Sequence, residues 1–216
     1  MLQKILTELT KTNTTLVAVS KTKPVAAIQA MYDEGQRIFG ENRVQELVEK
    51  EAVLPKDIEW HQIGHLQTNK VKYIAPFVSL IHAVDSLKLL KEINKQAAKN
   101  DRVIDCLLQF HIAEESSKFG FDEAEVTTLL KSETYKQLQN IRIIGVMGMA
   151  TFTDNEAQVK QEFRHLKNIF DALKNTFFPA NDDFKEISMG MSGDYQLAIS
   201  EGSTMVRIGS LLFGSR

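Results

Sequence analysis

Cysteine is almost absent from this chain of 216 residues, which contains only Cys106. A single cysteine can form neither an internal disulfide nor a cysteine-based zinc site, so a reducing compartment is the natural environment for the protein. The surrounding stretch VIDCLLQF predicts a buried strand. We therefore expect a cytoplasmic protein in which the thiol is part of the core.

Long apolar runs are also missing. No stretch approaches the roughly 18 to 20 apolar residues that a membrane-spanning helix needs. The N-terminal segment MLQKILTELTKTN has lysine and glutamate inside its apolar pattern. Its apolar residues recur at helical spacing, which predicts a short amphipathic helix and not a signal peptide. We expect no membrane partner.

Charge of one sign is not in excess, since 26 basic and 28 acidic residues give a net charge of -2. This balance, without runs of like charge, argues against binding to nucleic acid or to anionic membranes. The five histidines have no metal-type spacing, so we expect no metal site. The glycine-x-serine-x-glycine elbow of serine hydrolases is absent as well.

The chain does contain a regular alternation of short apolar runs with segments of helical spacing. Alternating strands and helices, with strands apolar on both faces, indicate a parallel sheet covered by helices. The eight predicted strands are 14–20, 37–41, 58–64, 77–84, 105–112, 141–149, 186–191 and 205–214. The predicted helices between them are 24–35, 42–52, 68–75, 86–100, 122–133, 156–177 and 194–202.

Eight such units in a little over 200 residues predict an α/β fold, a single-domain (β/α)8 barrel of the TIM type spanning 1–216. An open doubly wound sheet is the alternative. Its usual glycine fingerprint after the first strand is missing, because that position reads SKTKPV. In such barrels the functional residues lie at the C-terminal ends of the strands.

Two lysines follow the first strand, and strand alternation separates them. Lys21 shares a face with Val17 and Val19, whereas Lys23 directly precedes Pro24 and belongs to the turn. A lysine at the barrel mouth suits Schiff-base chemistry with a carbonyl compound. The structural alternative is a lysine that reaches solvent or pairs with Glu41.

Two turns of small residues follow the seventh and eighth strands, GMSGD and VRIGS. Barrels often bind phosphate at this location through backbone N–H groups and hydroxyls. Ser192, Gly193, Gly209 and Ser210 suit that task, and ordinary turn formation is the alternative.

Arg207 lies on the eighth strand between two apolar residues, so its guanidinium must meet an acceptor in or near the site. A structural ion pair with a strand-end carboxylate is the alternative. In a closed barrel, Lys21 on strand one adjoins strand eight, so the lysine and the phosphate cradle would lie together. This combination suits a phosphorylated aldehyde such as pyridoxal phosphate.

At these residues the sequence resembles the pyridoxal phosphate homeostasis proteins, single-domain relatives of the alanine racemase barrel. The resemblance runs through nearly the whole chain. Its blocks are LVAVSKTKP, FGENRVQE, WHQIGHLQTNK, SSKFGF, LKNIF, SMGMSGD and EGSTMVRIGSLLFG.

The resemblance implies a fold-type III pyridoxal phosphate-binding barrel with the cofactor held as an aldimine on Lys21. It further implies that Ser192 and the Gly209–Ser210 turn hold the phosphate, that Arg207 reaches the pyridine nitrogen and that Asn42 lines the ring edge. Four positions depart from the family pattern as it is usually found: Gln62, His65, Gly193 and Ser210. Lys118, in the SSKFGF block, follows strand five and lies too far from the cradle to be the first choice.

The function implied is intracellular homeostasis of vitamin B6 and amino acids, without catalytic turnover. No second domain with an opposing acid or base follows the eighth strand before Arg216. The expected partners are pyridoxal phosphate and, as candidates, apo forms of enzymes that use it, and we expect a monomer. The alternatives are a pyridoxal phosphate-dependent racemase or related enzyme, and a cofactor-free barrel enzyme that acts on a sugar phosphate.

Overall fold

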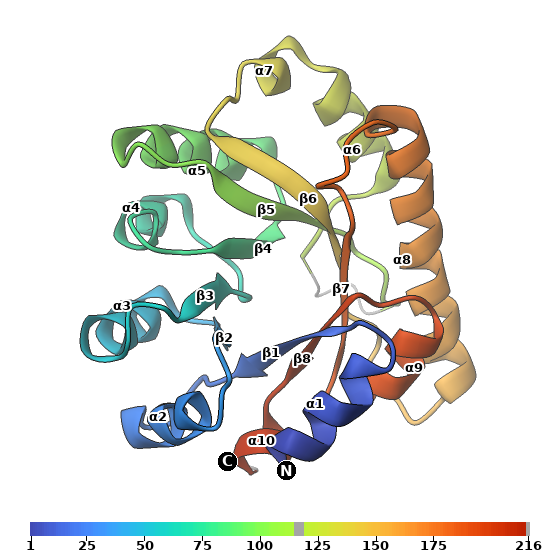
Figure 1. The fold of residues 1–216 in the computed structure, drawn as a ribbon. Coiled ribbons are helices and arrows are strands. Elements are labelled where there is room, and N and C mark those ends of the chain that lie inside the picture. The colour runs from blue at the N-terminus through green and yellow to red at the C-terminus, as the bar shows by residue number, and fades with distance from the viewer. Residues whose placement is uncertain (115–118, 215–216) are drawn as a thin grey trace.

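Parallel strands close into a complete barrel in the computed structural model, which describes residues 1–114 and 119–214 (Figure 1). Each strand pairs with the next in the chain, and β1 pairs with β8 to close the ring. The strands are β1 (Thr15–Val19), β2 (Ile38–Glu41), β3 (Glu59–Gln62), β4 (Leu80–Val84), β5 (Ile104–Gln109), β6 (Ile141–Met147), β7 (Glu186–Met191) and β8 (Met205–Ile208).

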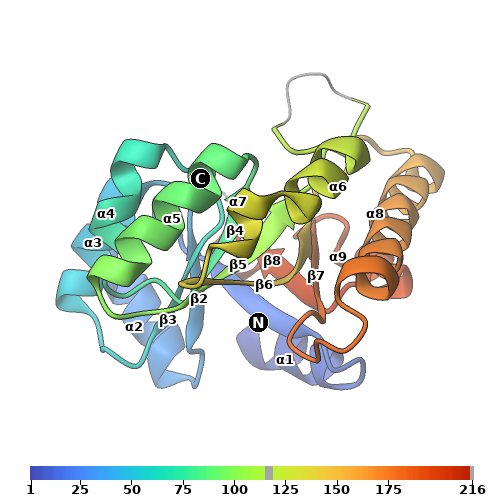
Figure 2. The ribbon, with the colours of Figure 1, turned by 90° about the horizontal axis from the view of Figure 1, so that it is seen from above.

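Helices surround the barrel on its outside (Figure 1), and the view turned by 90° shows them flanking the strands on both sides (Figure 2). They are α1 (Leu2–Thr10), α2 (Val25–Asp33), α3 (Val44–Val53), the 3-10 turn η1 (Thr68–Lys70), α4 (Val71–Ile74), α5 (Leu87–Lys99), α6 (Glu123–Lys131), α7 (Glu133–Lys136), α8 (Glu156–Phe177), α9 (Tyr195–Ser200) and α10 (Ser210–Phe213). Local signals set several helix starts. Ser86 caps α5, and Asp122 with Glu125 forms a capping box on α6.

Strand side chains alternate between the barrel interior and the layer beneath the helices. Val17, Leu107, Met147 and Met205 pack together inside the barrel. The opposite faces contribute Phe39, Trp60, Cys106 and others to the larger core shared with the helices. The apolar face of α1 packs on the outer side of β1 and β8. The apolar alternation of the sequence therefore becomes two concentric layers, and only the inner layer leads to the barrel mouth.

The predicted (β/α)8 barrel of the TIM type is confirmed, and the open-sheet alternative is wrong because β1 and β8 are hydrogen-bonded neighbours. The prediction was wrong at the end of the eighth strand. Residues 205–214 were expected to be one strand, but β8 ends at Ile208 and α10 begins at Ser210. A Cβ on Gly209, the residue between the two elements, would lie 3.2 Å from Val19, so the chain passes close to β1 at this point.

No helix in the described ranges combines the length and the apolar character needed to cross a membrane. The segment 122–133 was predicted as one helix. The helix α6 ends at Lys131, and Glu133, the last residue of the predicted segment, begins the separate helix α7, whose N-terminus the hydroxyl of Ser132 caps.

Candidate functional site

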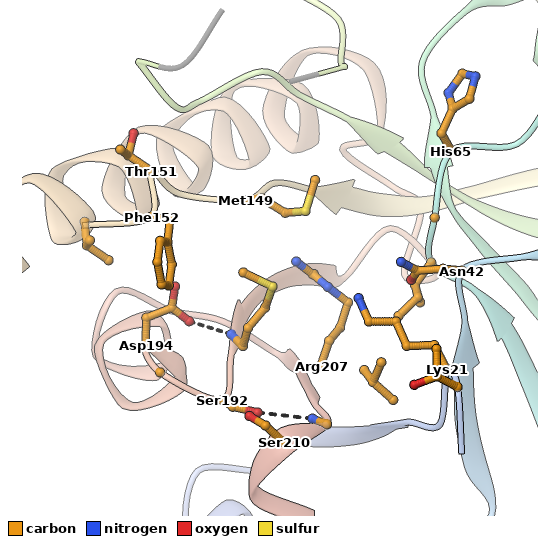
Figure 3. Close-up of a pocket in the computed structure, with 18 of the residues that line it drawn as sticks. Lys21, Asn42, His65, Met149, Thr151, Phe152, Ser192, Asp194, Arg207 and Ser210 are labelled. Atoms are coloured by element: carbon orange, nitrogen blue, oxygen red, sulfur yellow. Dashed lines mark hydrogen bonds between the residues drawn. The ribbon is translucent and has the colours of Figure 1, made fainter. Parts of the chain in front are cut away.

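A cavity of about 620 Å³ opens at the C-terminal ends of the strands. All of the side chains and turns predicted for the site line it, namely Lys21, Asn42, Ser192, Arg207, Gly209 and Ser210. Figure 3 shows the side chains of Lys21 and Arg207 extending into the same part of the cavity from β1 and β8. The barrel closure therefore brings together residues from both ends of the chain.

Lys21 lies in a tight turn that directly follows β1. The N–H of Lys23 donates to the carbonyl of Ser20 at 3.0 Å and closes this turn. The ammonium of Lys23 donates to the carbonyls of Phe213 and Gly214, both at 3.1 Å. Lys23 thus ties the turn, to which the sequence assigned it, to the end of α10.

Glu41 had been considered as the partner of Lys21. Its carboxylate is fully buried on the outer side of the barrel, where it accepts hydrogen bonds from Ser20 Oγ at 2.6 Å and Lys50 Nζ at 2.7 Å. Burial raises the pKa of Glu41, and the hydrogen bonds from Lys50 and Ser20 oppose that rise. The buried ion pair of Glu41 is therefore made with Lys50, a residue that the sequence analysis did not single out.

The two small-residue turns are joined directly. The N–H of Gly209 donates to Ser192 Oγ at 3.2 Å, and the carboxylate of Asp194 accepts the N–H of Met191 at 2.5 Å (Figure 3). A Cβ on Gly209 would lie 3.2 Å from the Cβ and the carbonyl oxygen of Val19, whereas one on Gly193 would meet nothing within 4 Å. Gly209 is thus required for close approach of the strands, and Gly193 is open to the cavity.

Arg207 is a buried cation at the floor of the cavity, with 4% of its surface exposed. It donates to Ser188 Oγ at 2.6 Å and to the carbonyl of Gly148 at 3.1 Å. Burial lowers the pKa of Arg207 to about 10, and the charge of Asp194 opposes this effect. The side chain stays cationic at neutral pH, and these two hydrogen bonds go to a hydroxyl and a carbonyl, not to the carboxylate considered as the alternative.

Two buried histidines extend this polar layer across the barrel. Ser188 Oγ lies 3.0 Å from His82 Nδ1, and His82 Nε2 lies 3.0 Å from His61 Nδ1. Burial lowers the pKa of His61 to about 3 and that of His82 well below its ordinary value, so both rings are neutral. His61 and His82 thus belong to a hydrogen-bonded polar layer inside the barrel. Ser188 and His82 were missed, although each is a polar residue inside a predicted apolar strand.

Of the four positions that depart from the family pattern, His65, Gly193 and Ser210 line the cavity, whereas Gln62 is fully buried and outside its lining. Gln62 Nε2 donates to the carbonyls of Asn42 and Gly64 at 3.0 and 3.1 Å, so it fixes the loop that carries Asn42. His65 Nδ1 lies 3.0 Å from Asp85 Oδ2.

Aromatic side chains complete the rim. Phe119 stacks on the ring of His65 with centroids 4.4 Å apart. Phe152 lines the cavity from the loop after β6 and is 97% exposed. Lys118, which the sequence analysis had considered, lies outside the described residues.

The arrangement combines an amine, a buried guanidinium, hydroxyls and backbone amides around one cavity. Within the described residues, no group of three or more histidine, cysteine, aspartate or glutamate side chains could hold a metal ion. These donors suit a ligand that has both a carbonyl carbon and an anionic group.

Comparison with known proteins gives matches along almost the full chain. The family model for the alanine racemase N-terminal domain matches residues 2–216. A pyridoxal phosphate homeostasis protein of Aquifex aeolicus is 42% identical over 202 residues, which cover 93% of this chain and 86% of the relative. The protein of the same name from Escherichia coli K12 is 38% identical over 206 residues, covering 94% and 86%.

Several solved structures are similar to this chain in fold. PipY of Synechococcus elongatus with pyridoxal phosphate bound superposes with a TM-score of 0.86 at 34% identity, covering 99% of this chain and 100% of that one. The same protein without the cofactor gives a TM-score of 0.89 at 35% identity, covering 98% and 99%. An alanine racemase of Bartonella henselae shares the fold, with a TM-score of 0.70 at 19% identity, covering 93% and 56%.

Proposed function

Because the chain belongs to the family of the alanine racemase N-terminal domain and, within it, to the pyridoxal phosphate homeostasis proteins, we propose that it binds pyridoxal phosphate at the barrel mouth. The observation that carries this proposal is the convergence of Lys21, Arg207 and the two small-residue turns on one cavity. The related PipY, of similar fold and length, has been solved with this cofactor bound.

The donors present fit the chemistry of the cofactor. In our proposal the phosphate lies against Ser192 and the Gly209–Ser210 turn, where α10 begins. The first N–H groups of a helix have no carbonyl partner within it and are available to an anion. A Cβ on Gly193 would meet nothing within 4 Å, so the neighbouring turn leaves open space for such a ligand.

Arg207 is proposed to face the pyridine nitrogen. Its cation is held by Ser188 and Gly148 before any ligand arrives, so little side-chain entropy would be lost on binding. A guanidinium that donates a hydrogen bond to the ring nitrogen keeps that nitrogen unprotonated. The ring then withdraws electrons less strongly than one paired with a carboxylate, which disfavours carbanion chemistry.

Lys21 is proposed to bind the cofactor covalently as a Schiff base. The neutral amine of the lysine adds to the aldehyde carbon, and loss of one water molecule gives the imine. Asn42 lies near the same strand ends, on the loop fixed by Gln62, and is proposed to line the edge of the ring.

The biological role that we propose is homeostasis of the cofactor, with storage and delivery to apo-enzymes, in place of turnover of a substrate. The names of the relatives support the homeostasis part. A role in amino-acid homeostasis, the cytoplasmic location and the monomeric state remain predictions from the sequence.

Two measurements test this function. Mixing the loaded protein with an apo-enzyme that needs pyridoxal phosphate should restore that enzyme's activity, and Lys21→Ala should hold less cofactor to deliver. The assay for the alternative function is racemisation of free amino acids. Sustained, Lys21-dependent racemisation at ordinary enzymatic rates would show an enzyme and overturn the homeostasis role.

A further inference from the structure

The turn that carries Lys21 has an unusual backbone conformation. Thr22 has a φ of +64°, in the left-handed region. The other described non-glycine residues with positive φ are Asn13 and Asp101, whose short polar side chains tolerate this region. Threonine is branched at Cβ and rarely adopts it, so this backbone must be held by its surroundings.

A cluster of three charged side chains lies against this turn from the side of α3. The ammonium of Lys50 donates to Glu41 Oε1 at 2.7 Å and to Glu46 Oε1 at 2.6 Å. Its third hydrogen bond, at 2.8 Å, goes to the backbone carbonyl of Ser20, the residue before Lys21. Glu41 is the last residue of β2, and Glu46 and Lys50 lie on α3. We call these three residues the α3 cluster.

The α3 cluster also holds the backbone on the other side of Lys21. The N–H of Thr22 donates to Glu46 Oε1 at 2.5 Å. The hydroxyl of Ser20 donates to Glu41 Oε1 at 2.6 Å. The peptide groups before and after Lys21 are therefore both bonded to charged side chains, and the residue with positive φ is one of those fixed.

The burial of the α3 cluster argues for a role in geometry more than in stability. The side chains of Lys50 and Glu41 are 6% and 0% exposed. Burying an ion pair costs so much hydration that apolar residues in its place often give the folded protein equal stability. A point charge with three directed hydrogen bonds can, however, fix a backbone in a conformation that apolar packing would not select.

We propose that Glu41, Glu46 and Lys50 are positioning residues that hold the Ser20–Thr22 backbone in its left-handed turn and so aim the Lys21 amine at the cofactor aldehyde. This proposal rests on the proposed function, since it concerns how the same lysine reacts. It assigns a role in cofactor capture to residues that lie outside the cavity, on the far side of the sheet.

Glu46→Ala is the most direct test, because Glu46 is half-buried and its removal leaves the Glu41–Lys50 pair intact. Glu49→Ala is the matched control, a glutamate on the same helix whose partner is the exposed Gln45. In the protein without cofactor, hydrogen exchange of the Thr22 amide should become faster in Glu46→Ala and stay unchanged in Glu49→Ala. Formation of the Schiff-base absorption band should slow about tenfold in Glu46→Ala alone, the equivalent of one hydrogen bond to a charged group.

Two further variants separate positioning from general destabilisation. Glu46→Gln keeps an oxygen that can accept the Thr22 N–H, so it should recover most of the rate. Thr22→Gly removes the backbone strain, because glycine adopts positive φ readily. Adding Glu46→Ala to Thr22→Gly should therefore slow capture much less than adding it to the natural sequence.

The outcomes distinguish this proposal from the function it rests on. If the natural protein forms no Schiff base at Lys21, the proposed function fails and the positioning role fails with it. If the natural protein reacts but Glu46→Ala matches Glu49→Ala in both amide exchange and rate, only the positioning role is overturned.

Discussion

Arg207 and Lys21, which both line the cavity, stand out in the sequence because each is a basic residue within or at the end of an otherwise apolar strand. Such a residue has few explanations other than a partner or a ligand. Lys50 could not be recognised in this way, because in VQELVEKEAV it reads as an exposed helix lysine. Its i, i+4 spacing from Glu46 was the one visible signal. Its burial depends on how closely α3 packs on the sheet, which the sequence pattern does not specify.

Arg207→Lys should weaken cofactor binding although the positive charge is kept. The planar guanidinium donates to Ser188 and to Gly148 at the same time through two different nitrogens. The ammonium of a lysine has one nitrogen and cannot reproduce this geometry. Loss of the hydrogen bond that Arg207 is proposed to make to the pyridine nitrogen corresponds to about a tenfold rise in the dissociation constant. Titration of the variant with pyridoxal phosphate checks this, and an unchanged constant would show that Arg207 does not hold the ligand.

The turn after β8 shows where prediction of the elements succeeded and where it did not. The eight strands and their order followed from the apolar alternation, but the end of β8 and the existence of α10 did not. Apart from Arg207 and Ser210 the run MVRIGSLLFG is made of apolar residues and glycine, so its pattern cannot distinguish a long strand from a strand followed by a short helix. A Cβ on Gly209 would lie 3.2 Å from Val19, and a packing relation between residues so far apart in the sequence is not visible in that pattern.

Gly209→Ala and Gly193→Ala make a matched pair for the two turns. The added methyl group at 209 would press on Val19 at 3.2 Å, so we expect a lower melting temperature and weaker cofactor binding. The same methyl group at 193 meets nothing within 4 Å and should leave the melting temperature within about a degree of the natural protein, as surface substitutions usually do. Equal effects of the two variants on stability would contradict the close approach of β8 to β1.

The closed barrel places a layer of polar groups in its interior, and the stability of the molecule should therefore depend on pH. His61 and His82 are neutral in the folded protein because burial lowers the pKa of both rings. In the unfolded chain their pKa values return to about 6.5, so below that pH the unfolded state binds more protons. Stability should fall as the pH drops from about 6.5 towards 3, by up to about 1.4 kcal/mol per pH unit for each ring. The raised pKa of Glu41 has the opposite effect on stability at acidic pH, because its carboxyl takes up a proton more readily in the folded protein. This is one group against two histidines.

Urea unfolding of the natural protein and His61→Gln between about pH 7.5 and about pH 5.5 measures this dependence. The slope of stability against pH should become shallower in His61→Gln, because one of the two buried rings is removed. Identical slopes in the two proteins would contradict a folded state with neutral buried histidines.

The covalent attachment of pyridoxal phosphate to Lys21 is tested most directly by borohydride reduction of the loaded protein, followed by peptide mass mapping. Reduction converts the imine into a stable secondary amine, so the position of the cofactor survives digestion. We expect the pyridoxyl mass on the peptide that contains Lys21, and no such mass at that position in Lys21→Ala. A pyridoxyl adduct on Lys23 or Lys70, or no adduct at all, would contradict the assignment.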